Sequence, residues 1–255
     1  MRQRKTVTVL NTPCILTTCE NLTDDLSLWC ITQGHELPLS VDYTNVHIVA
    51  LRTMDSSFYQ NTSSVDWFVS DSQVLNWAIS LQGGDHHSRV YGPDFMNYFF
   101  RNSDTSITHY FLGASQDCLE MLIQNLREIQ PDYQLVGSHN GYFQIQDEPS
   151  IIEDINRCQP DIVWVGLGTP KQQEWIHRNK SLLNCKALLA VGFAFDVNAG
   201  TKKDAPSWLG PLGLTWLYRL GCEPKRLWKR YFIYNSVFLF RLVIQHCSSK
   251  KLVLL

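Results

Sequence analysis

The stretch ITHYFLGASQDCLEMLIQNLREIQPDYQLVGSH (107–139) decides the fold class of this 255-residue chain. Residues 107–114 and 133–139 are short apolar runs typical of strands, and residues 115–130 repeat apolar side chains at the spacing of an amphipathic helix. A strand, a helix and a second strand in this order form a β-α-β unit, in which the two strands are parallel. The stretch therefore predicts an α/β fold.

The same alternation continues on both sides of this unit. We expect strands or strand–helix units at 38–51, 65–71, 161–168 and 187–196, and helices at 72–82, 148–159 and 170–183. Repeated units of this kind build a Rossmann-like doubly wound sheet, whose ligands bind at the carboxyl ends of the strands. No stretch rich in Gly, Pro or Ser interrupts the pattern before about residue 200.

The C-terminal part of the chain differs from the rest in charge. Residues 210–255 carry eight basic side chains and one acidic side chain, a net +7, whereas residues 1–209 carry 14 basic and 23 acidic side chains, a net −9. The apolar pattern predicts helices broken near Pro211 and Pro224. We therefore expect an α/β body at 1–204 and a C-terminal helical, basic appendage at 205–255, which would seek an anionic partner.

The longest apolar run of the appendage is YFIYNSVFLFRLVI (231–244), which is 14 residues long and contains Arg241. A membrane-spanning helix needs about 20 mostly apolar residues. We expect this segment to lie in the interface of an anionic membrane, with an amphipathic helix packed on the body as the equally weighted alternative. The N-terminus lacks a signal-peptide pattern and the eight cysteines include no C-x-x-C pair, which indicates the cytoplasm.

Four loops that follow predicted strands combine glycine with polar side chains, at 112–115, 138–143, 166–173 and 192–203. Glycine lets the backbone approach a ligand, and the N-terminus of a following helix binds phosphate. Four such loops at one edge of a sheet suggest a ligand that contains a nucleotide. None matches a G-x-G-x-x-G or P-loop motif, and the chain has no D-x-D triplet, so we expect no cofactor and no metal. Lys, Arg and backbone N–H groups would then neutralise a leaving diphosphate.

Eight segments together resemble a known family. They are YTN (43–45), VSDS (69–72), SRVYGPDF (88–95), FLGA (111–114), NGYF (140–143), VGLGTPKQQEW (165–175), AFDVNAGTKKDAP (194–206) and GLTWLYRLGCEPKRLWKRY (213–231). Their order and spacing are similar to the WecG/TagA/CpsF family of bacterial glycosyltransferases. The resemblance implies inverting, metal-independent transfer of a sugar, N-acetylmannosamine-type or another hexose, from a UDP-sugar to a polyprenyl-diphosphate-linked saccharide. It also implies cell-surface polysaccharide synthesis by a peripheral protein at the inner face of the cytoplasmic membrane.

The resemblance also assigns roles by position. Asp71 matches the family's proposed general base, and Asn45 matches the asparagine of its Thr-x-Asn motif, so both are expected to be catalytic. The residues expected to bind substrate are Thr44, Arg89, Gly113, Gly168, Lys171, Gln172, Asp196, Arg219, Arg226 and Arg230. The chain departs from the family pattern at Tyr43, Ser72 and Gln173, and Phe193 and Asn198 also fall at positions that vary from the commonest pattern. These departures lie at the predicted substrate sites, so they concern donor and acceptor identity more than reaction type.

Chemistry supports Asp71 independently of the resemblance. A sugar hydroxyl is a poor nucleophile, and a carboxylate within hydrogen-bond reach can remove its proton during attack. Asp71 follows the apolar run VDWFV (65–69), where partial burial would raise the carboxyl pKa. The alternative role for Asp71 is to cap the helix predicted at 72–82, and spacing alone favours it.

Two other functions remain open at this stage. An NAD-dependent Rossmann oxidoreductase has the same α/β order, but it requires a glycine fingerprint that neither FLGASQ nor VGLGTP supplies. A non-catalytic, membrane-bound scaffold would also keep the fold. We expect no nucleic-acid partner, and a homo-oligomer stays open.

Overall fold

A computed structural model describes residues 4–32, 37–85 and 87–253 of the protein. Its strands are β1 (Thr6–Val9), β2 (Thr12–Ile15), β3 (Leu39–Thr44), β4 (Trp67–Ser70), β5 (Thr108–Gly113), β6 (Gln134–His139), β7 (Ile162–Gly166) and β8 (Ala187–Ala190). They form an eight-stranded sheet in the order β1-β2-β4-β3-β8-β7-β5-β6. β1 and β2 are antiparallel, and the other described neighbours run parallel. The predicted α/β class is confirmed.

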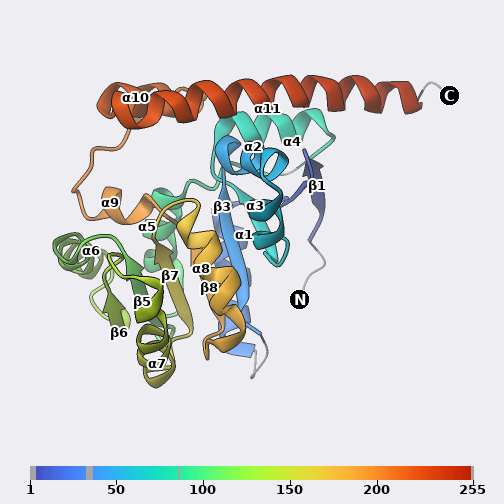
Figure 1. The fold of residues 1–255 in the computed structure, drawn as a ribbon. Coiled ribbons are helices and arrows are strands. Elements are labelled where there is room, and N and C mark those ends of the chain that lie inside the picture. The colour runs from blue at the N-terminus through green and yellow to red at the C-terminus, as the bar shows by residue number, and fades with distance from the viewer. Residues whose placement is uncertain (1–3, 33–36, 86, 254–255) are drawn as a thin grey trace.

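Helices cover both faces of this sheet (Figure 1). They are α1 (Cys19–Thr32), α2 (Val46–Met54), α3 (Ser56–Asn61), α4 (Gln73–Leu81), α5 (Gly92–Asn102), α6 (Gln116–Ile129), α7 (Glu148–Cys158), α8 (Lys171–Asn179), α9 (Ala194–Asn198), α10 (Thr215–Cys222) and α11 (Pro224–Val253). Short 3-10 turns lie at Ile145–Asp147, Lys180–Leu182 and Ser207–Leu209.

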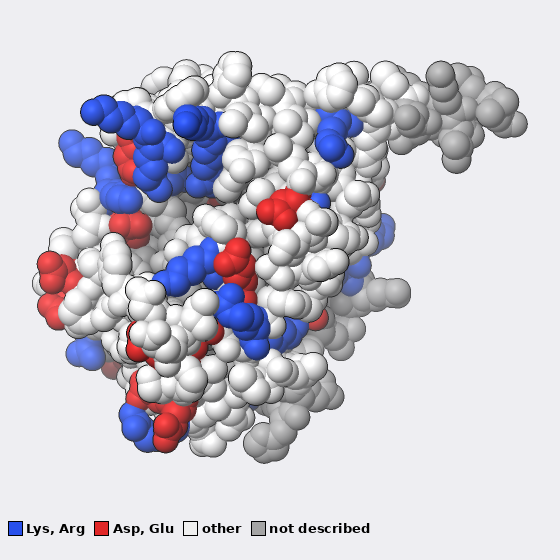
Figure 2. All heavy atoms as spheres, viewed as in Figure 1, with Lys and Arg blue, Asp and Glu red and all other residues white. Residues whose placement is uncertain are grey.

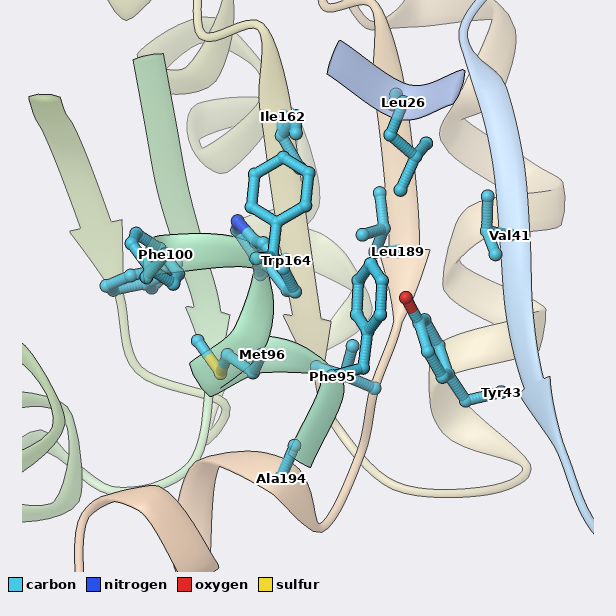
Figure 3. Packing of buried hydrophobic residues seen from close by; sticks show 14 of the residues in the cluster. Leu26, Val41, Tyr43, Phe95, Met96, Phe100, Ile162, Trp164, Leu189 and Ala194 are labelled. Atoms are coloured by element: carbon cyan, nitrogen blue, oxygen red, sulfur yellow. The ribbon is translucent and has the colours of Figure 1, made fainter. Parts of the chain in front are cut away.

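Strand β7 shows why its sequence is a continuous apolar run. Ile162 and Trp164 pack into a cluster with α1, α5 and α6, whereas Val163 and Val165 pack into another with α7 and α8. Successive side chains of a strand point to opposite faces, so a strand between two helical layers must be apolar at every position. In Figure 3, the Trp164 ring lies beside Phe100 of α5, with their ring centroids 5.5 Å apart.

Helix α11 is 30 residues long and lies across one end of the body, over α2 and α4 (Figure 1). Phe238 and Leu242 are buried in a cluster that includes Val49 of α2. The rings of Tyr234 and His47 also meet edge to face, with centroids 4.4 Å apart. The predicted helical nature of the C-terminal segment is confirmed, and part of α11 belongs to a hydrophobic core. The division of the chain at residue 204 stays a prediction.

Among the described residues, no helix has the length and apolarity to cross a membrane, and this includes α11.

The strand predicted at 187–196 is wrong in its second half. β8 ends at Ala190, Gly192 has a φ of 51°, and residues Ala194–Asn198 form α9. A positive φ turns the chain out of the extended conformation, and glycine adopts it without steric cost. The sequence also gave no expectation for β1, β2, α1 or α5. The predicted helix breaks near Pro211 and Pro224 are confirmed, because Pro211 lies between the turn at Ser207–Leu209 and α10, and Pro224 is the first residue of α11.

The strand order places a ligand-binding edge. β3 lies beside β8, with β4, β2 and β1 on one side of this pair and β7, β5 and β6 on the other. The chain passes from one half of the sheet to the other between β4 and β5, and the two halves meet where β3 pairs with β8. In open α/β sheets, such a switch point forms a crevice outside the carboxyl ends of the strands.

Candidate active site

A cavity of about 480 Å³ opens at this switch point. Its wall combines residues that directly follow β3, β4, β5, β7 and β8 with arginines from α10 and α11. The predicted site residues that line it are Asn45, Asp71, Gly168, Lys171, Gln172, Asp196, Arg219, Arg226 and Arg230. The structure thus brings residues from distant parts of the sequence to one place. Thr44, Arg89 and Gly113 do not line this cavity.

Asn45 and Asp71 are neighbours because each extends one of two paired strands by one residue. Thr44 of β3 is in register with Ser70 of β4, and the Asp71 N–H donates to the Thr44 carbonyl at 2.7 Å. The Asn45 Oδ1 accepts from the backbone N–H of His47 at 3.1 Å and so caps α2. The oxygen of Asn45 is therefore committed to the helix, which leaves its NH₂ group for the Asp71 carboxylate.

Asp71 is held as a hydrogen-bond acceptor in a largely buried position. Its Oδ1 accepts from the Gly92 N–H at the start of α5, at 2.8 Å. Burial raises the pKa of Asp71, while the Gly92 N–H, Arg89, Arg219 and the Asn45 side chain oppose this increase. A carboxylate with a raised pKa is a stronger proton acceptor. The expectation that burial raises this pKa is confirmed.

The alternative role for Asp71, capping α4, is wrong. The N-cap of α4 is Ser72, whose Oγ accepts from the Leu75 N–H at 3.3 Å. Because Ser72 already supplies the cap, the carboxylate of Asp71 is available to face the cavity.

Gln172 organises the loops after β7 and β8. It is buried, and its Oε1 accepts from the Gly168 N–H at 3.1 Å. Gly168 has a φ of 77°, a backbone conformation that would be strained for a residue with a side chain. A Cβ atom on Gly192 would lie 3.2 Å from the same Gln172 oxygen. The amide of Gln172 therefore fixes the backbone that forms the floor of the cavity.

Lys171 and Asp196 also make contacts within the protein. The Lys171 Nζ donates to the Gly141 carbonyl at 2.8 Å and to the Phe143 carbonyl at 3.4 Å, which ties α8 to the loop after β6. Burial lowers the pKa of Lys171. The Asp196 Oδ1 lies 3.8 Å from the Lys202 Nζ. Lys202 lines the cavity as well, so Lys171 and Lys202 both place positive side chains in its wall, with the Asp196 carboxylate beside Lys202.

Arginines from the C-terminal helices form the positive side of the cavity. Arg219 comes from α10, whereas Arg226 and Arg230 come from α11. Arg226 pairs with Glu223, and burial lowers the pKa of Arg230 to about 10, so its guanidinium is still charged at neutral pH. Figure 2 shows Lys and Arg side chains gathered where α10 and the start of α11 lie in Figure 1. Guanidinium groups fit phosphate oxygens in a bidentate manner, so this side suits a diphosphate.

The three predicted residues outside the cavity have other contacts. The hydroxyl of Thr44 is buried and donates to the Asp42 carboxylate. Gly113 has a φ of 144°, and a Cβ atom there would lie 2.4 Å from the Gly166 backbone, so β5 and β7 approach each other closely because Gly113 has no side chain. The Nε of Arg89 donates to the Asp71 carbonyl at 3.0 Å. Arg89 lies in an adjoining cavity.

Sequence reasoning did not assign site roles to several residues of the cavity wall, namely Tyr43, Tyr91, Phe193 and Lys202. The Tyr91 hydroxyl donates to Asp204 Oδ1 at 2.7 Å and connects α5 with the segment before the appendage. Tyr91 and Lys202 lie inside the quoted segments SRVYGPDF and AFDVNAGTKKDAP, so those segments contained the signal. No group of three or more His, Cys, Asp or Glu side chains within 4–32, 37–85 and 87–253 is arranged to hold a metal ion.

Comparison with known proteins identifies a family and several similar enzymes. The model of the glycosyl transferase WecG/TagA/CpsF family matches residues 7–252. The chain is 28% identical over 227 residues to an N-acetylglucosaminyldiphosphoundecaprenol N-acetyl-beta-D-mannosaminyltransferase of Bacillus subtilis (strain 168), covering 89% of this chain and 87% of that enzyme. An enzyme of the same name from Bacillus spizizenii is 30% identical, covering 66% of this chain and 65% of that enzyme. Another from Staphylococcus aureus (strain MRSA252) is 25% identical, covering 74% of this chain and 85% of that enzyme.

Proposed function

The chain belongs to the WecG/TagA/CpsF family of glycosyltransferases, and from this premise we propose which sugar transfer it catalyses. The donor is a UDP-sugar, of the N-acetylmannosamine type or another hexose. The acceptor is a saccharide linked to a polyprenyl diphosphate, in the synthesis of a cell-surface polysaccharide. The relatives support this acceptor class, because their names specify an N-acetylglucosaminyl diphosphoundecaprenol.

The observation that carries the proposal is that Asp71 and three arginines line one cavity. Asp71 and Asn45 lie at the carboxyl ends of β4 and β3, and Arg219, Arg226 and Arg230 line the same cavity. The site therefore joins one proton acceptor to a wall that attracts a diphosphate. This is the pair of functions that sugar transfer from a nucleotide diphosphate requires.

The proposed reaction is a single displacement. The acceptor hydroxyl oxygen attacks the anomeric carbon, and Asp71 takes the hydroxyl proton as the new C–O bond forms. The bond between the anomeric carbon and the UDP oxygen breaks, and UDP leaves with the electron pair. The arginines stabilise the charge that develops on the diphosphate. One displacement inverts the configuration at the anomeric carbon.

Family resemblance and charge together support a membrane-surface location. Lys225 and Lys229 are exposed on α11, on which Ile233 and Ile244 are exposed as well. Basic and apolar side chains on one helix favour the interface of an anionic membrane. We assign this helix to the inner face of the cytoplasmic membrane, where a polyprenyl-linked acceptor is embedded.

A product-mass assay tests the proposal. The full chain is incubated with N-acetylglucosaminyl diphosphate linked to a short prenyl chain and with UDP-N-acetylmannosamine, UDP-N-acetylglucosamine or UDP-glucose. We expect one of these donors to add one sugar mass to the acceptor, with release of UDP, inversion at the new linkage and the same rate in EDTA. If a catalytically active preparation needs added metal, the metal-independent mechanism is wrong.

Measurements of thermal stability distinguish a glycosyltransferase from the two alternatives, an NAD-dependent oxidoreductase and a non-catalytic scaffold. A ligand that binds the native state raises the unfolding midpoint. UDP should raise this midpoint and NAD should not. Stabilisation by NAD alone would favour an oxidoreductase, and a chain that neither binds UDP nor adds a sugar mass would be a scaffold.

A further inference from the structure

A second cavity, of about 670 Å³, adjoins the first one. Both cavities are lined by Asn45, Asp71, Tyr91, Arg219 and Arg230, so they meet at the carboxylate proposed as the base. The second cavity lies between the start of α4 and the helices α10 and α11. A molecule in it would therefore reach Asp71 from between α4, α10 and α11, whereas the loops after β7 and β8 line the first cavity.

The wall of the second cavity is apolar over most of its area. We call it the apolar groove and define it by Trp77 of α4, Trp216 of α10, and Trp228, Phe232 and Leu239 of α11. Four of these side chains are large and solvent-exposed: Trp77 to 45%, Trp228 to 52%, Phe232 to 73% and Leu239 to 54%. An exposed apolar patch of this kind marks a binding surface. The groove thus continues from the catalytic carboxylate to the solvent-facing side of α11.

The charge distribution restricts the occupant further. Arg219 and Arg230 line both cavities, whereas the rest of the groove is mostly aromatic and aliphatic, with Asn235 and Ser236 of α11 among its polar residues. An occupant that satisfies both ends has an anionic group beside the arginines and an apolar chain beyond it. A prenyl chain attached to a diphosphate has this structure, and its saccharide would then lie beside Asp71.

On the basis of the proposed function, we propose that the apolar groove binds the isoprene units next to the diphosphate of the acceptor. The groove is a specificity site for the lipid, separate from the cavity for the donor. Burying these isoprene units against the tryptophans holds the acceptor hydroxyl toward Asp71. Transfer efficiency should then depend on the chain attached to the diphosphate, even in the absence of a membrane.

The experiment compares two acceptors that differ only in the lipid. N-acetylglucosaminyl diphosphate is esterified either with farnesol or with methanol, and kcat/KM is measured for the full chain without vesicles at a saturating UDP-sugar concentration. Trp77→Ala and Phe232→Ala remove parts of the groove. Trp208→Ala and Phe240→Ala are matched controls, because these residues are exposed to 64% and 70% but lie outside the groove.

We expect the parent chain to prefer the farnesyl acceptor by more than about tenfold in kcat/KM, which corresponds to about 1.4 kcal/mol. Trp77→Ala and Phe232→Ala should each lower kcat/KM for the farnesyl acceptor by roughly fivefold to tenfold. A loss of this size is expected when one or two CH₂ groups of the lipid are no longer buried. The methyl acceptor should lose less than twofold with these variants, and the controls should match the parent chain on both acceptors.

Three results would overturn the assignment. Equal kcat/KM for the two acceptors would show that the groove contributes nothing to lipid recognition, and equal losses on both acceptors would give Trp77 and Phe232 a structural role only. A farnesyl preference that disappears when phosphatidylglycerol vesicles are added would indicate that phospholipid acyl chains occupy the groove.

If no acceptor reacts, the proposed function fails but the groove can still be tested by binding. Calorimetric titration then compares farnesyl diphosphate with inorganic pyrophosphate on the parent chain and on Trp77→Ala. Tighter binding of farnesyl diphosphate that Trp77→Ala abolishes supports the groove. Equal affinity of the parent for the two ligands refutes it.

Discussion

The guanidinium carbon of Arg219 on α10 lies 3.7 Å from the centroid of the Phe193 ring, in the turn between β8 and α9. A second contact, 3.5 Å between the Lys202 Nζ and Glu223 Oε1, also links the C-terminal helices to the segment after α9. Arg219 lines both cavities, so the C-terminal helices contribute one guanidinium to the place where the cavities meet. Phe193 fixes this position from the body of the protein.

The first prediction concerns this contact. Phe193→Ala removes the ring under Arg219 and should lower kcat roughly fivefold, because a cation–π contact is worth about 1 kcal/mol. Phe193→Tyr keeps the ring and should restore most of the rate. Steady-state kinetics check both variants. If Phe193→Ala changes KM for the donor and leaves kcat intact, Phe193 contacts the substrate instead of positioning Arg219.

A second prediction concerns the chemistry of Asp71. Asp71→Asn keeps the shape of the side chain but cannot accept the hydroxyl proton, so the transfer rate should fall by a factor of about 10²–10⁴. UDP affinity, measured by calorimetry, should stay within a few-fold of the parent value. Asp55→Asn is the control, since Asp55 caps α3 away from both cavities and asparagine also caps helices. Turnover of Asp71→Asn close to the parent rate would remove Asp71 from the mechanism.

Asp71 also predicts a dependence on pH. Burial raises its folded-state pKa above the ordinary value of 3.8, and the base works only when it is ionised. The rate should therefore fall with decreasing pH as the solution passes through this raised pKa, and Asp71→Asn should lose this dependence.

The raised pKa of Asp71 also determines how the stability of the folded chain changes with pH. Between the unfolded and folded pKa values the folded chain binds more protons than the unfolded chain, so stability decreases as pH rises through this window. At neutral pH the buried, ionised carboxylate opposes folding. Asp71→Asn should consequently raise the unfolding temperature at pH 7 and not at a pH below both values. A lower unfolding temperature at pH 7 would show that the hydrogen bonds to the carboxylate outweigh its burial.

The sequence predicted the second half of the sheet well because each element there has a complete local signal. β5, α6, β6 and β7 are apolar runs or amphipathic repeats bounded by Pro or Gly, and no distant contact is needed to recognise them. β8 shows the limit of this approach. The run ALLAVGFAFD continues apolar beyond Ala190, and only the positive φ at Gly192 shows that α9 begins there.

The site residues that directly follow a strand were predictable from the sequence. Asn45 and Asp71 come directly after β3 and β4, and parallel register alone makes them neighbours. The bond between Lys171 of α8 and the Gly141 carbonyl joins segments 30 residues apart. Trp77 lines one cavity together with residues of α11 that lie more than half of the chain away. Such contacts depend on how the helices pack, and a local pattern contains no information about that packing.

A fourth prediction separates the two kinds of basic side chain on α11. Lys225 and Lys229 are exposed and lie outside both cavities, whereas Arg226 lines the first cavity and Arg230 lines both. Lys225→Glu with Lys229→Glu should weaken sedimentation with anionic vesicles by about 1 kcal/mol per residue removed, and high salt should have the same effect. Transfer to a short-chain acceptor in solution should continue.

Arg230→Gln, by contrast, should lower that transfer in solution. If the double lysine variant binds vesicles as the parent does, the membrane assignment fails.

The last prediction tests whether α11 is part of the folded body. Phe238 is fully buried in a cluster with Val49 of α2 and Phe68 of β4, whereas Phe240 on the same helix is exposed to 70%. Truncating a buried phenylalanine typically costs about 3–5 kcal/mol, and truncating an exposed one less than about 0.5 kcal/mol. Phe238→Ala should therefore lower the free energy of unfolding steeply, and Phe240→Ala should leave it unchanged within error. Urea unfolding monitored by circular dichroism measures both. Because Phe238 completes a cluster formed by α2, α4 and the strands beneath them, deleting residues 210–255 should also destabilise the remaining body. If Phe238→Ala has the stability of the parent, α11 is not packed on α2 in solution, and the apolar groove, which needs α4 and α11 side by side, would lose one wall.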